Sequence, residues 1–218
     1  MMVKALIFDL DNTLIDRQRA FKEMLKDKFS LLCDDHSLVD QMVKDVLIWD
    51  NNGVVSRDIS LGSWADKYHY DRKIAEDISN DWANTSGEIA YLFYDVRDTL
   101  TELKKKYTIA ILTNGNAVSQ RKKLKTINID GLIDYSLVSG ECNYKKPEKE
   151  IFELVLNDLN LKADEAIYIG DNYNIDVLGP RSIGMKAIYV SRNNEIHRDA
   201  TTINNIHELL DLDFNRIL

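Results

Sequence analysis

Short apolar runs recur along the chain and predict β-strands. Five such runs lie at residues 3–8, 109–112, 137–138, 166–169 and 187–190. Each is too short for a helix and is rich in β-branched or aromatic residues, which favours a strand. Because polar residues hardly interrupt these runs, we expect strands that are covered on both faces, as in a parallel sheet.

Amphipathic helical spacing occupies the chain between several of these runs. Residues 96–107 keep apolar side chains on one helical face, and residues 151–159 carry a second apolar stripe, in a helix that we expect Pro147 to open. Strands that alternate with such helices indicate βαβ units. The predicted fold class is therefore α/β, with a Rossmann-like parallel sheet and helices on both of its faces.

One long segment breaks this alternation. From residue 17 to residue 91 the apolar positions follow helical spacing only, in stripes at residues 21–32, 38–49 and 74–82. The residues before this segment are too few to form a domain, so the first strand must join the later ones. We predict an α/β core made of residues 1–16 and 92–218, and an inserted all-helical domain at residues 17–91.

Composition and charge narrow the range of functions. The 218 residues are 44% hydrophobic and 29% charged, and they carry a net charge of −8, which is typical of a globular protein with an acidic surface. This charge disfavours binding of a nucleic acid polymer. No apolar run approaches the ~20 residues that a membrane-spanning helix needs. The short N-terminal apolar stretch is interrupted by acids, unlike a signal peptide.

The two cysteines bear on the compartment. Cys33 and Cys142 show no metal-binding or redox spacing. A single disulfide is one reading, but we favour two free thiols in a reducing cytoplasm. We therefore expect a cytoplasmic protein with neither membrane nor nucleic acid as a partner, present as a monomer or a small homo-oligomer.

Acidic and polar residues follow the predicted strands where each one ends, and ligands bind at that edge of an open parallel sheet. They are Asp9, Asp11 and Thr13 after the first run, Thr113 and Asn114 after the second, Lys146 after the third, and Asp171 and Asp176 after the fourth. Asp9 and Asp11, two apart in an extended chain, are expected to point the same way. One acid at a strand end is ordinarily a solvated loop residue. Four acids without histidine or cysteine predict an all-oxygen site for Mg²⁺.

Four motifs in this sequence resemble, in order, those of the haloacid dehalogenase (HAD) superfamily, and specifically its phosphatases with a helical cap. They are FDLDNTL at residues 8–14, ILTNG at 111–115, KKPEKEIF at 145–152 and IGDNYNIDVLGPRSIGM at 169–185. The segment 17–91 falls where that family inserts its cap. The resemblance implies a Mg²⁺-dependent phosphatase that hydrolyses a small phosphorylated metabolite, such as a nucleoside monophosphate or a sugar phosphate, through an aspartyl-phosphate.

The resemblance also implies a role for each acid. Asp9 corresponds to the nucleophile that takes up the phosphoryl group. Asp11 corresponds to the general acid and base, with its backbone carbonyl at the metal. Asp171 corresponds to a direct ligand, and Asp176 to a residue that orients a bound water or Lys146, or that ligates the metal itself. The implied metal site thus comprises Asp9, Asp11, Asp171 and Asp176.

The remaining motif residues correspond to groups that handle phosphate. Thr113 and Asn114 would hold the phosphoryl oxygens, and Lys146 would neutralise charge on both Asp9 and the phosphoryl group. Its neighbour Lys145 is expected to be solvated. These residues meet the central electrostatic problem of bringing an anionic substrate to a cluster of carboxylates.

Other functions of the same fold stay open. A phosphomutase of the β-phosphoglucomutase kind also needs Asp9 and Asp11, and it differs in how long its phosphoenzyme survives. A catalytically silent binding module is disfavoured, because such a protein would usually lack the nucleophile or a metal ligand. A dehalogenase needs no Mg²⁺ and has little use for Asp11.

The predicted cap holds all three tryptophans. Helical spacing places Trp49 and Trp82 in its core, whereas the polar neighbours of Trp64 favour exposure, where its ring could stack on a flat leaving group. Arg17 and Arg19 follow the first link to the cap. We expect them either to be solvated or to meet the leaving group.

Overall fold

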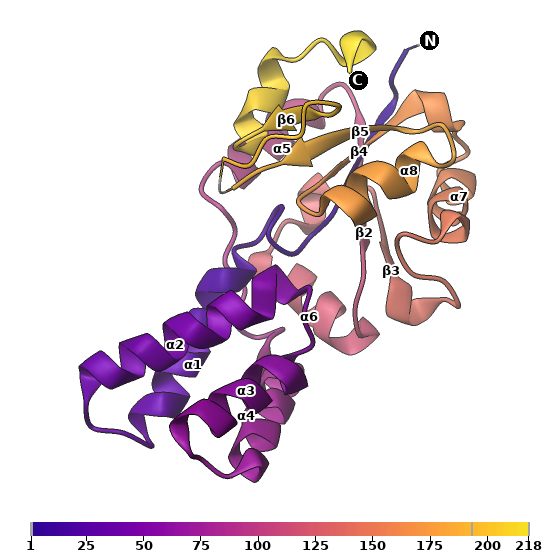
Figure 1. Cartoon of the computed structure of the whole chain (residues 1–218). Coiled ribbons are helices and arrows are strands. Elements are labelled where there is room, and N and C mark those ends of the chain that lie inside the picture. Colours follow the sequence, from indigo (N-terminus) through magenta and orange to yellow (C-terminus); the bar gives the residue numbers. More distant parts are fainter. Residues whose placement is uncertain (1, 193, 218) are drawn as a thin grey trace. The chain divides into compact units, whose positions relative to one another are not determined.

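The computed structural model describes residues 2–192 and 194–217, and the chain divides into two compact units (Figure 1). The core unit comprises Met1–Ile15 and Leu92–Leu218, and the helical unit comprises Asp16–Tyr91. Asp16 belongs to the helical unit, whereas the sequence predicts that the core extends to this residue. Its carboxylate accepts a hydrogen bond of 2.9 Å from the Arg19 backbone N–H, and so caps helix α1 (Arg17–Ser30).

The core unit contains one sheet of six parallel strands in the order β3-β2-β1-β4-β5-β6. The strands are β1 (Ala5–Phe8), β2 (Thr108–Thr113), β3 (Tyr135–Val138), β4 (Ala166–Gly170), β5 (Lys186–Val190) and β6 (Thr201–Ile203). The α/β fold class is thereby confirmed. The sequence predicts the first five strands but not β6, because the polar stretch from Asn193 to Thr201 is typical of a loop. Asn193 lies outside the described residues.

Buried side chains cover both faces of the sheet. In β1, Ala5 and Ile7 belong to a hydrophobic cluster with Phe152 of helix α7, while Leu6 and Phe8 alternate to the opposite face and are also fully buried. The helices of this unit are α5 (Val96–Leu103), α6 (Ala117–Ile127), α7 (Lys149–Asp158) and the short α8 (Gly179–Arg181). Helix α7 begins two residues after Pro147, where we had expected it to open. Glu148 N–H instead bonds to Lys145 C=O and closes a turn.

The helical unit has a hydrophobic core of its own. Its helices are α1, α2 (His36–Asp50), α3 (Arg57–Tyr68) and α4 (Arg72–Thr85); the sequence predicts all except α3. Trp64 lies at the centre of this core, with its ring stacked against Phe29 and Tyr70 at centroid distances of 4.4 and 4.9 Å. The expectation that Trp64 is exposed is therefore wrong. Trp82 is buried as predicted, and Trp49 is half-buried at the edge of the same cluster.

Arg17 also has a structural role inside the helical unit. Its guanidinium is buried and makes two hydrogen bonds, of 2.8 and 3.2 Å, to the fully buried carboxylate of Asp50. Gly53, with a φ of +85°, passes directly over the same guanidinium, where a Cβ would meet it at 2.9 Å. Arg17 is thus neither solvated nor available to a ligand in this unit, whereas Arg19 is exposed and pairs with Glu23.

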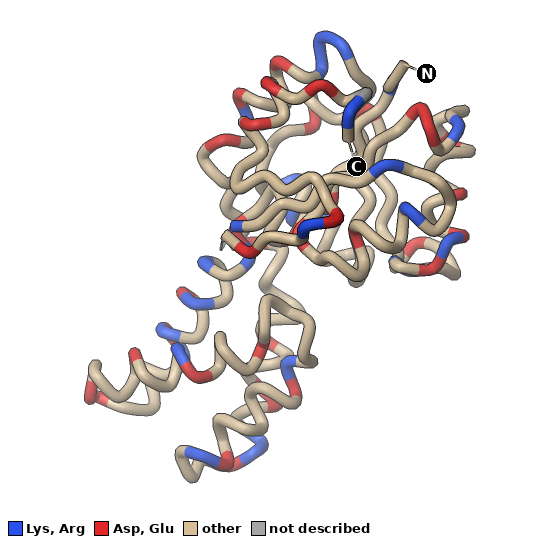
Figure 2. Tube along the Cα trace, turned by 45° about the horizontal axis from the view of Figure 1, so that its top comes forward, with Lys and Arg blue, Asp and Glu red and all other residues tan. Residues whose placement is uncertain are grey.

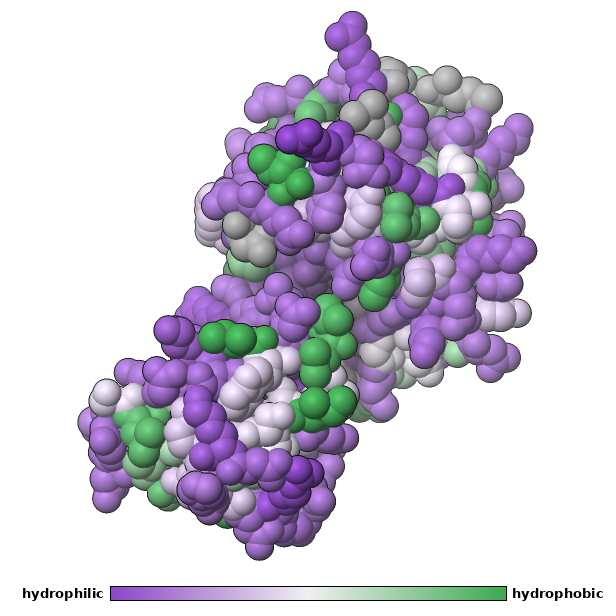
Figure 3. Space-filling view, viewed as in Figure 1, coloured by the Kyte–Doolittle hydropathy of each residue, from purple (hydrophilic) through white to green (hydrophobic). Residues whose placement is uncertain are grey.

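The described surface agrees with the composition. Lys and Arg positions are interspersed with Asp and Glu positions along the Cα trace (Figure 2), and hydrophilic residues predominate on the face shown in Figure 3. Within the described residues, every helix is too short or too polar for a bilayer span. Cys33 and Cys142 are both free, as we favoured.

Candidate active site

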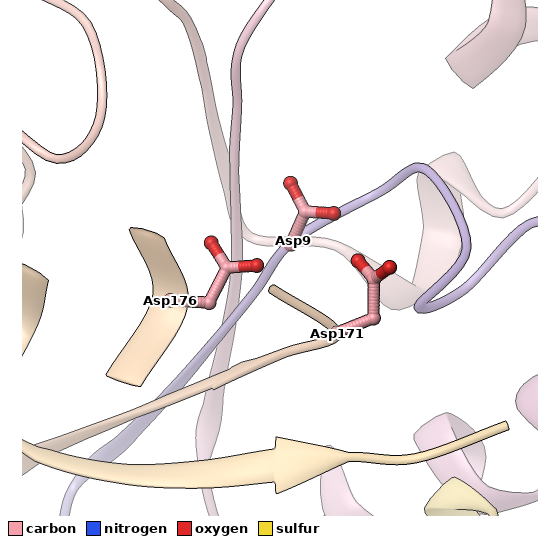
Figure 4. Close-up of side chains that lie close together, drawn as sticks. All are labelled: Asp9, Asp171 and Asp176. Carbon is pink, nitrogen blue, oxygen red and sulfur yellow. The ribbon is translucent and has the colours of Figure 1, made fainter. Parts of the chain in front are cut away.

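Three carboxylates converge beyond the ends of the central strands (Figure 4). Asp9 directly follows β1, Asp171 directly follows β4, and Asp176 lies on a π-helix at Tyr173–Leu178. One carboxylate oxygen from each lies within 4.8 Å of the others. Because β1 and β4 are paired parallel neighbours, their ends bring Asp9 and Asp171 to the same place.

Local backbone geometry fixes the third acid. Asp176 N–H bonds to Asn172 C=O at 2.6 Å, and Asn172 N–H returns a bond of 3.0 Å to Asp176 Oδ2. The side chain of Asp176 lies over Gly170, where a Cβ would come within 2.5 Å of it. Gly170 is therefore required so that the π-helix can bring Asp176 against the end of β4.

The Lys146 ammonium is surrounded by oxygen acceptors. Lys146 is 4% exposed, and its Nζ donates to Asp9 Oδ1 at 2.6 Å, Asp176 Oδ1 at 2.7 Å and the Tyr168 hydroxyl at 2.7 Å. The Tyr168 hydroxyl in turn donates to Leu112 C=O at 2.7 Å. Three acceptors match the three N–H donors of an ammonium, so Lys146 is held as a fixed positive charge between two of the acids.

Burial and mutual repulsion shift the pKa values of the cluster. Burial raises the pKa of Asp9 to about 7; Lys146 opposes the rise, and Asp176 adds to it. Burial, with repulsion from Asp9 and Asp176, also raises the pKa of Asp171 well above its usual range. Burial alone would lower the pKa of Lys146, but Asp176 and Asp9 raise it well above its ordinary value. The positive charge of Lys146 therefore does not fully balance the negative charge of the three acids.

The donor set suits a hard divalent cation. Asp9, Asp171 and Asp176 offer only carboxylate oxygens, and no histidine or cysteine belongs to the group that converges in the described part of the chain. Oxygen ligands of this kind, with room for water, are those that Mg²⁺ prefers. A cation at this position would also relieve the repulsion that raises the pKa values of Asp9 and Asp171. The residues present therefore fit Mg²⁺.

The hydroxyl and amide groups of the motifs are placed beside these acids. Thr13 Oγ1 donates to Asp171 Oδ1 at 3.3 Å. Thr113 is buried at the end of β2, next to β1. The amide of Asn114 exchanges two 2.9 Å hydrogen bonds with the backbone of Lys146. Asn114 thus holds the lysine loop in place, and its contact with the phosphoryl group stays a prediction.

Asp11 does not share the position of Asp9. Strand β1 ends at Phe8, so both acids lie beyond the strand whose regular alternation would align their side chains. The Asp11 carboxylate is instead bound by Lys123 Nζ, at 2.7 and 2.8 Å, and by Gln120 Nε2 at 2.9 Å. Within the described residues, the carboxylates that converge are those of Asp9, Asp171 and Asp176.

Three further residues of this site are not predicted from the sequence. Gln120 and Lys123 lie three positions apart on α6, and Tyr168 lies within β4. The sequence patterns around them are weak signals of function. Tyr168 is a tyrosine inside an apolar strand, and Gln120 and Lys123 share a helix face with the apolar Leu124. Each of these patterns is also common in residues that only pack.

Comparisons with known proteins identify the family of the chain and support its fold. A family model described as "Hydrolase: haloacid dehalogenase-like hydrolase" matches residues 3–184. The chain is 28% identical over 211 residues to N-acylneuraminate-9-phosphatase of Homo sapiens, which covers 88% of this chain and 84% of that protein. It is 27% identical over 208 residues to glyceraldehyde 3-phosphate phosphatase of Pyrococcus furiosus, with 86% and 80% covered. A Bacillus subtilis structure described as a HAD-hydrolase, YfnB, matches with a TM-score of 0.78 at 20% identity over 97% and 98% of the two chains.

Proposed function

This chain belongs to the haloacid dehalogenase-like hydrolases, and from that premise we propose that it is a Mg²⁺-dependent phosphatase that acts on a small phosphorylated metabolite through an aspartyl-phosphate. One observation carries the proposal. The carboxylates of Asp9, Asp171 and Asp176 converge within 4.8 Å, with the buried Lys146 ammonium 2.6 Å from Asp9. A nucleophile, an oxygen-rich cation site and a fixed positive charge are thereby joined at one strand edge.

The reaction divides between Asp9 and Asp11. An Asp9 oxygen attacks phosphorus, and the bond from phosphorus to the ester oxygen breaks. Asp11 gives that oxygen a proton, so the alcohol leaves neutral. Water then attacks the aspartyl-phosphate and passes a proton back to Asp11. Inorganic phosphate is released, and both carboxyl groups return to their starting states.

Charge balance explains why a cation is needed. The three converging aspartates, Asp9, Asp171 and Asp176, stand against the single ammonium group of Lys146. A phosphate monoester adds further negative charge. When bound by Asp9, Asp171 and Asp176, Mg²⁺ would supply the remaining positive charge and stabilise charge on the phosphoryl oxygens. Lys146 supplies its charge without reorganisation because its three bonds already hold it.

For the substrate we propose a sugar phosphate or a related phosphorylated polyol. The two curated relatives are named for an acylneuraminate 9-phosphate and for glyceraldehyde 3-phosphate, which are both phosphorylated carbohydrates or their derivatives. The case for a nucleoside monophosphate rested on an exposed Trp64. That ring is fully buried inside the helical unit, so it cannot serve as a stacking face there.

Location and assembly complete the proposal. Because Cys33 and Cys142 are free thiols, we propose the reducing cytoplasm as the location of the protein. We propose a monomer or a small homo-oligomer as its state. Light scattering on the purified protein measures the mass directly.

The first experiment measures turnover of 4-nitrophenyl phosphate and of a panel of sugar phosphates and nucleoside monophosphates. We expect hydrolysis that exhaustive chelation abolishes and Mg²⁺ restores, with sugar phosphates preferred to nucleotides. Full activity after chelation would remove the metal from the mechanism. Binding without turnover of any ester would favour a silent binding module.

The second experiment follows labelled phosphate in single turnovers. Asp9→Asn removes the nucleophile, so we expect neither turnover nor covalent label. Asp11→Asn leaves the nucleophile but removes the proton carrier, so we expect slow turnover with some phosphoenzyme accumulating. Covalent label on Asp9→Asn would contradict the assignment. A long-lived phosphoenzyme in the unaltered protein, with label passed to a second hydroxyl of the substrate, would indicate a mutase.

A further inference from the structure

Helix α6 presents two buried polar side chains to Asp11. Lys123 Nζ lies 2.7 Å from Oδ1 and 2.8 Å from Oδ2 of Asp11, so the ammonium spans both carboxylate oxygens. Gln120 Nε2 adds a third bond, of 2.9 Å, to Oδ2. The side chain of Lys123 is only 8% exposed. Three donors from one helix therefore fix both oxygens of a single carboxylate.

The same helix also connects Asp11 with strand β2. Gln120 Nε2 donates to Thr113 Oγ1 at 2.7 Å as well as to Asp11. A side-chain amide has two N–H donors, and these two contacts use both. Gln120 and Lys123, three positions apart, share the face of α6 that carries the buried Leu124 and Ile127. Asp11 is thus bound by side chains of a helix that is itself packed into the core unit.

Burying a lysine side chain destabilises the folded protein unless an ion pair compensates for it. Placing an ammonium in the interior requires desolvation and the loss of side-chain freedom, which an ion pair offsets only when its geometry is good. The exposed Lys122 and Lys125 on the same helix show that α6 has ample surface for lysine. At Lys123 the ammonium instead lies against the one active-site carboxylate that the Asp9–Asp171–Asp176 cluster does not include.

We propose that Lys123, assisted by Gln120, is the positioning residue that holds the Asp11 carboxyl group where it serves the leaving-group oxygen. This inference rests on the proposed function, in which Asp11 carries that proton. Without Lys123 the carboxyl group gains rotational freedom and spends less time within hydrogen-bond reach of the ester oxygen. In this proposal Lys123 acts on the leaving group through its ion pair with Asp11. Its effect should therefore depend on how much the leaving group needs a proton.

The test compares kcat/KM for two esters, because this constant includes departure of the leaving group. Nitrophenolate leaves readily without a proton, whereas an alkoxide does not. We expect Lys123→Met to lower kcat/KM for glycerol phosphate at least about tenfold more than for 4-nitrophenyl phosphate, a part of the ~10²–10⁴-fold that general acid catalysis contributes. Lys123→Arg should recover much of the loss. Lys122→Met, its exposed neighbour, is the matched control and should behave as the unaltered protein.

A double-mutant cycle isolates the path through Asp11. In an Asp11→Asn background, Lys123→Met should cost almost nothing further, because its partner no longer acts. Gln120→Leu, which leaves the ion pair in place, should show the same leaving-group selectivity to a smaller degree, and it covers the case in which Lys123→Met fails to fold. Equal losses on both esters, or an undiminished loss in the Asp11→Asn background, would overturn the inference. Absence of turnover by the unaltered protein would instead overturn the proposed function.

Discussion

Adjacent lysines in the loop before α7 have opposite environments. Lys146 is buried and donates to Asp9 and Asp176, whereas Lys145 is exposed. We predict that Lys146→Ala lowers kcat/KM for 4-nitrophenyl phosphate at least ~100-fold, because it removes a preorganised charge. Lys145→Ala should leave kcat/KM nearly unchanged. Steady-state kinetics with melting temperatures measures both, and equal losses would show that the charge that acts on the substrate is not the buried one.

The raised carboxyl pKa values predict that Mg²⁺ binding releases protons. Burial raises the pKa of Asp9 to about 7 and that of Asp171 well above its usual range. Below pH ~7 part of the folded protein therefore carries a proton that a cation must displace. We expect Mg²⁺ affinity to rise as the pH increases through about 7. Calorimetric titrations in two buffers of different ionisation enthalpy count the protons released, and an affinity independent of pH would contradict the prediction.

Individual site residues differ in how well sequence alone could identify them. Asp9 and Asp171 directly follow apolar strands, so the end of the run also marks the ligand edge of the sheet. Lys123 lies in the run Arg121-Lys122-Lys123-Leu124-Lys125. Which of these lysines is buried depends on the rotation of α6 about its axis, which tertiary packing decides. The contacts of the Asp11 carboxylate with Lys123 and Gln120 likewise depend on how α6 packs in the core unit.

At the scale of elements, burial on both faces made the central strands predictable. Continuous apolar runs mark β2, β1, β4 and β5, the four interior strands of the sheet. Strand β6 escaped prediction because it has three residues at the sheet edge, two of them half-exposed threonines. Helix α3 was not predicted because small residues such as Ser60 and Gly62 share its buried face with Trp64. Helix–helix packing, rather than an apolar stripe, defines that face.

A single added methyl group at Gly170, where β4 meets the π-helix, should impair the site strongly. A Cβ at Gly170 would lie 2.5 Å from the side chain of Asp176, so the alanine must displace that carboxylate. We predict that Gly170→Ala weakens Mg²⁺ binding and lowers kcat/KM about 100-fold, the scale of a 1 Å misplacement in an active site. Gly131→Ala is the matched control, because nothing lies within 4 Å of its Cβ position. Similar activity in the two variants would show that Asp176 can move without consequence.

At the scale of the whole molecule, chemistry and packing are divided between two cores. Asp9, Asp11, Lys146, Asp171 and Asp176 all belong to the core unit. The helical unit is one continuous segment with its own buried cluster and its own buried ion pair between Arg17 and Asp50. Long insertions of this kind are identifiable from sequence because their apolar period changes from that of strands to that of helices. The task of the inserted unit is harder to infer, because its aromatic rings fill its own interior.

Trp64 provides the test of this division. Its fully buried ring is stacked between Phe29 and Tyr70 at the centre of the helical unit. Trp64→Ala should lower the free energy of unfolding of that unit by ~3–5 kcal/mol, the usual cost of removing a large buried ring. Because every proposed Mg²⁺ ligand lies in the other unit, Mg²⁺ binding should persist at conditions where the helical unit has begun to unfold. Hydrogen exchange resolved by segment, with Mg²⁺ titrations on the same sample, measures both.

Trp64→Phe, which keeps a stacked ring, is the matched control and should lower the free energy of unfolding much less. A single transition in which Mg²⁺ binding disappears together with the helical unit would show that the two cores depend on each other for stability.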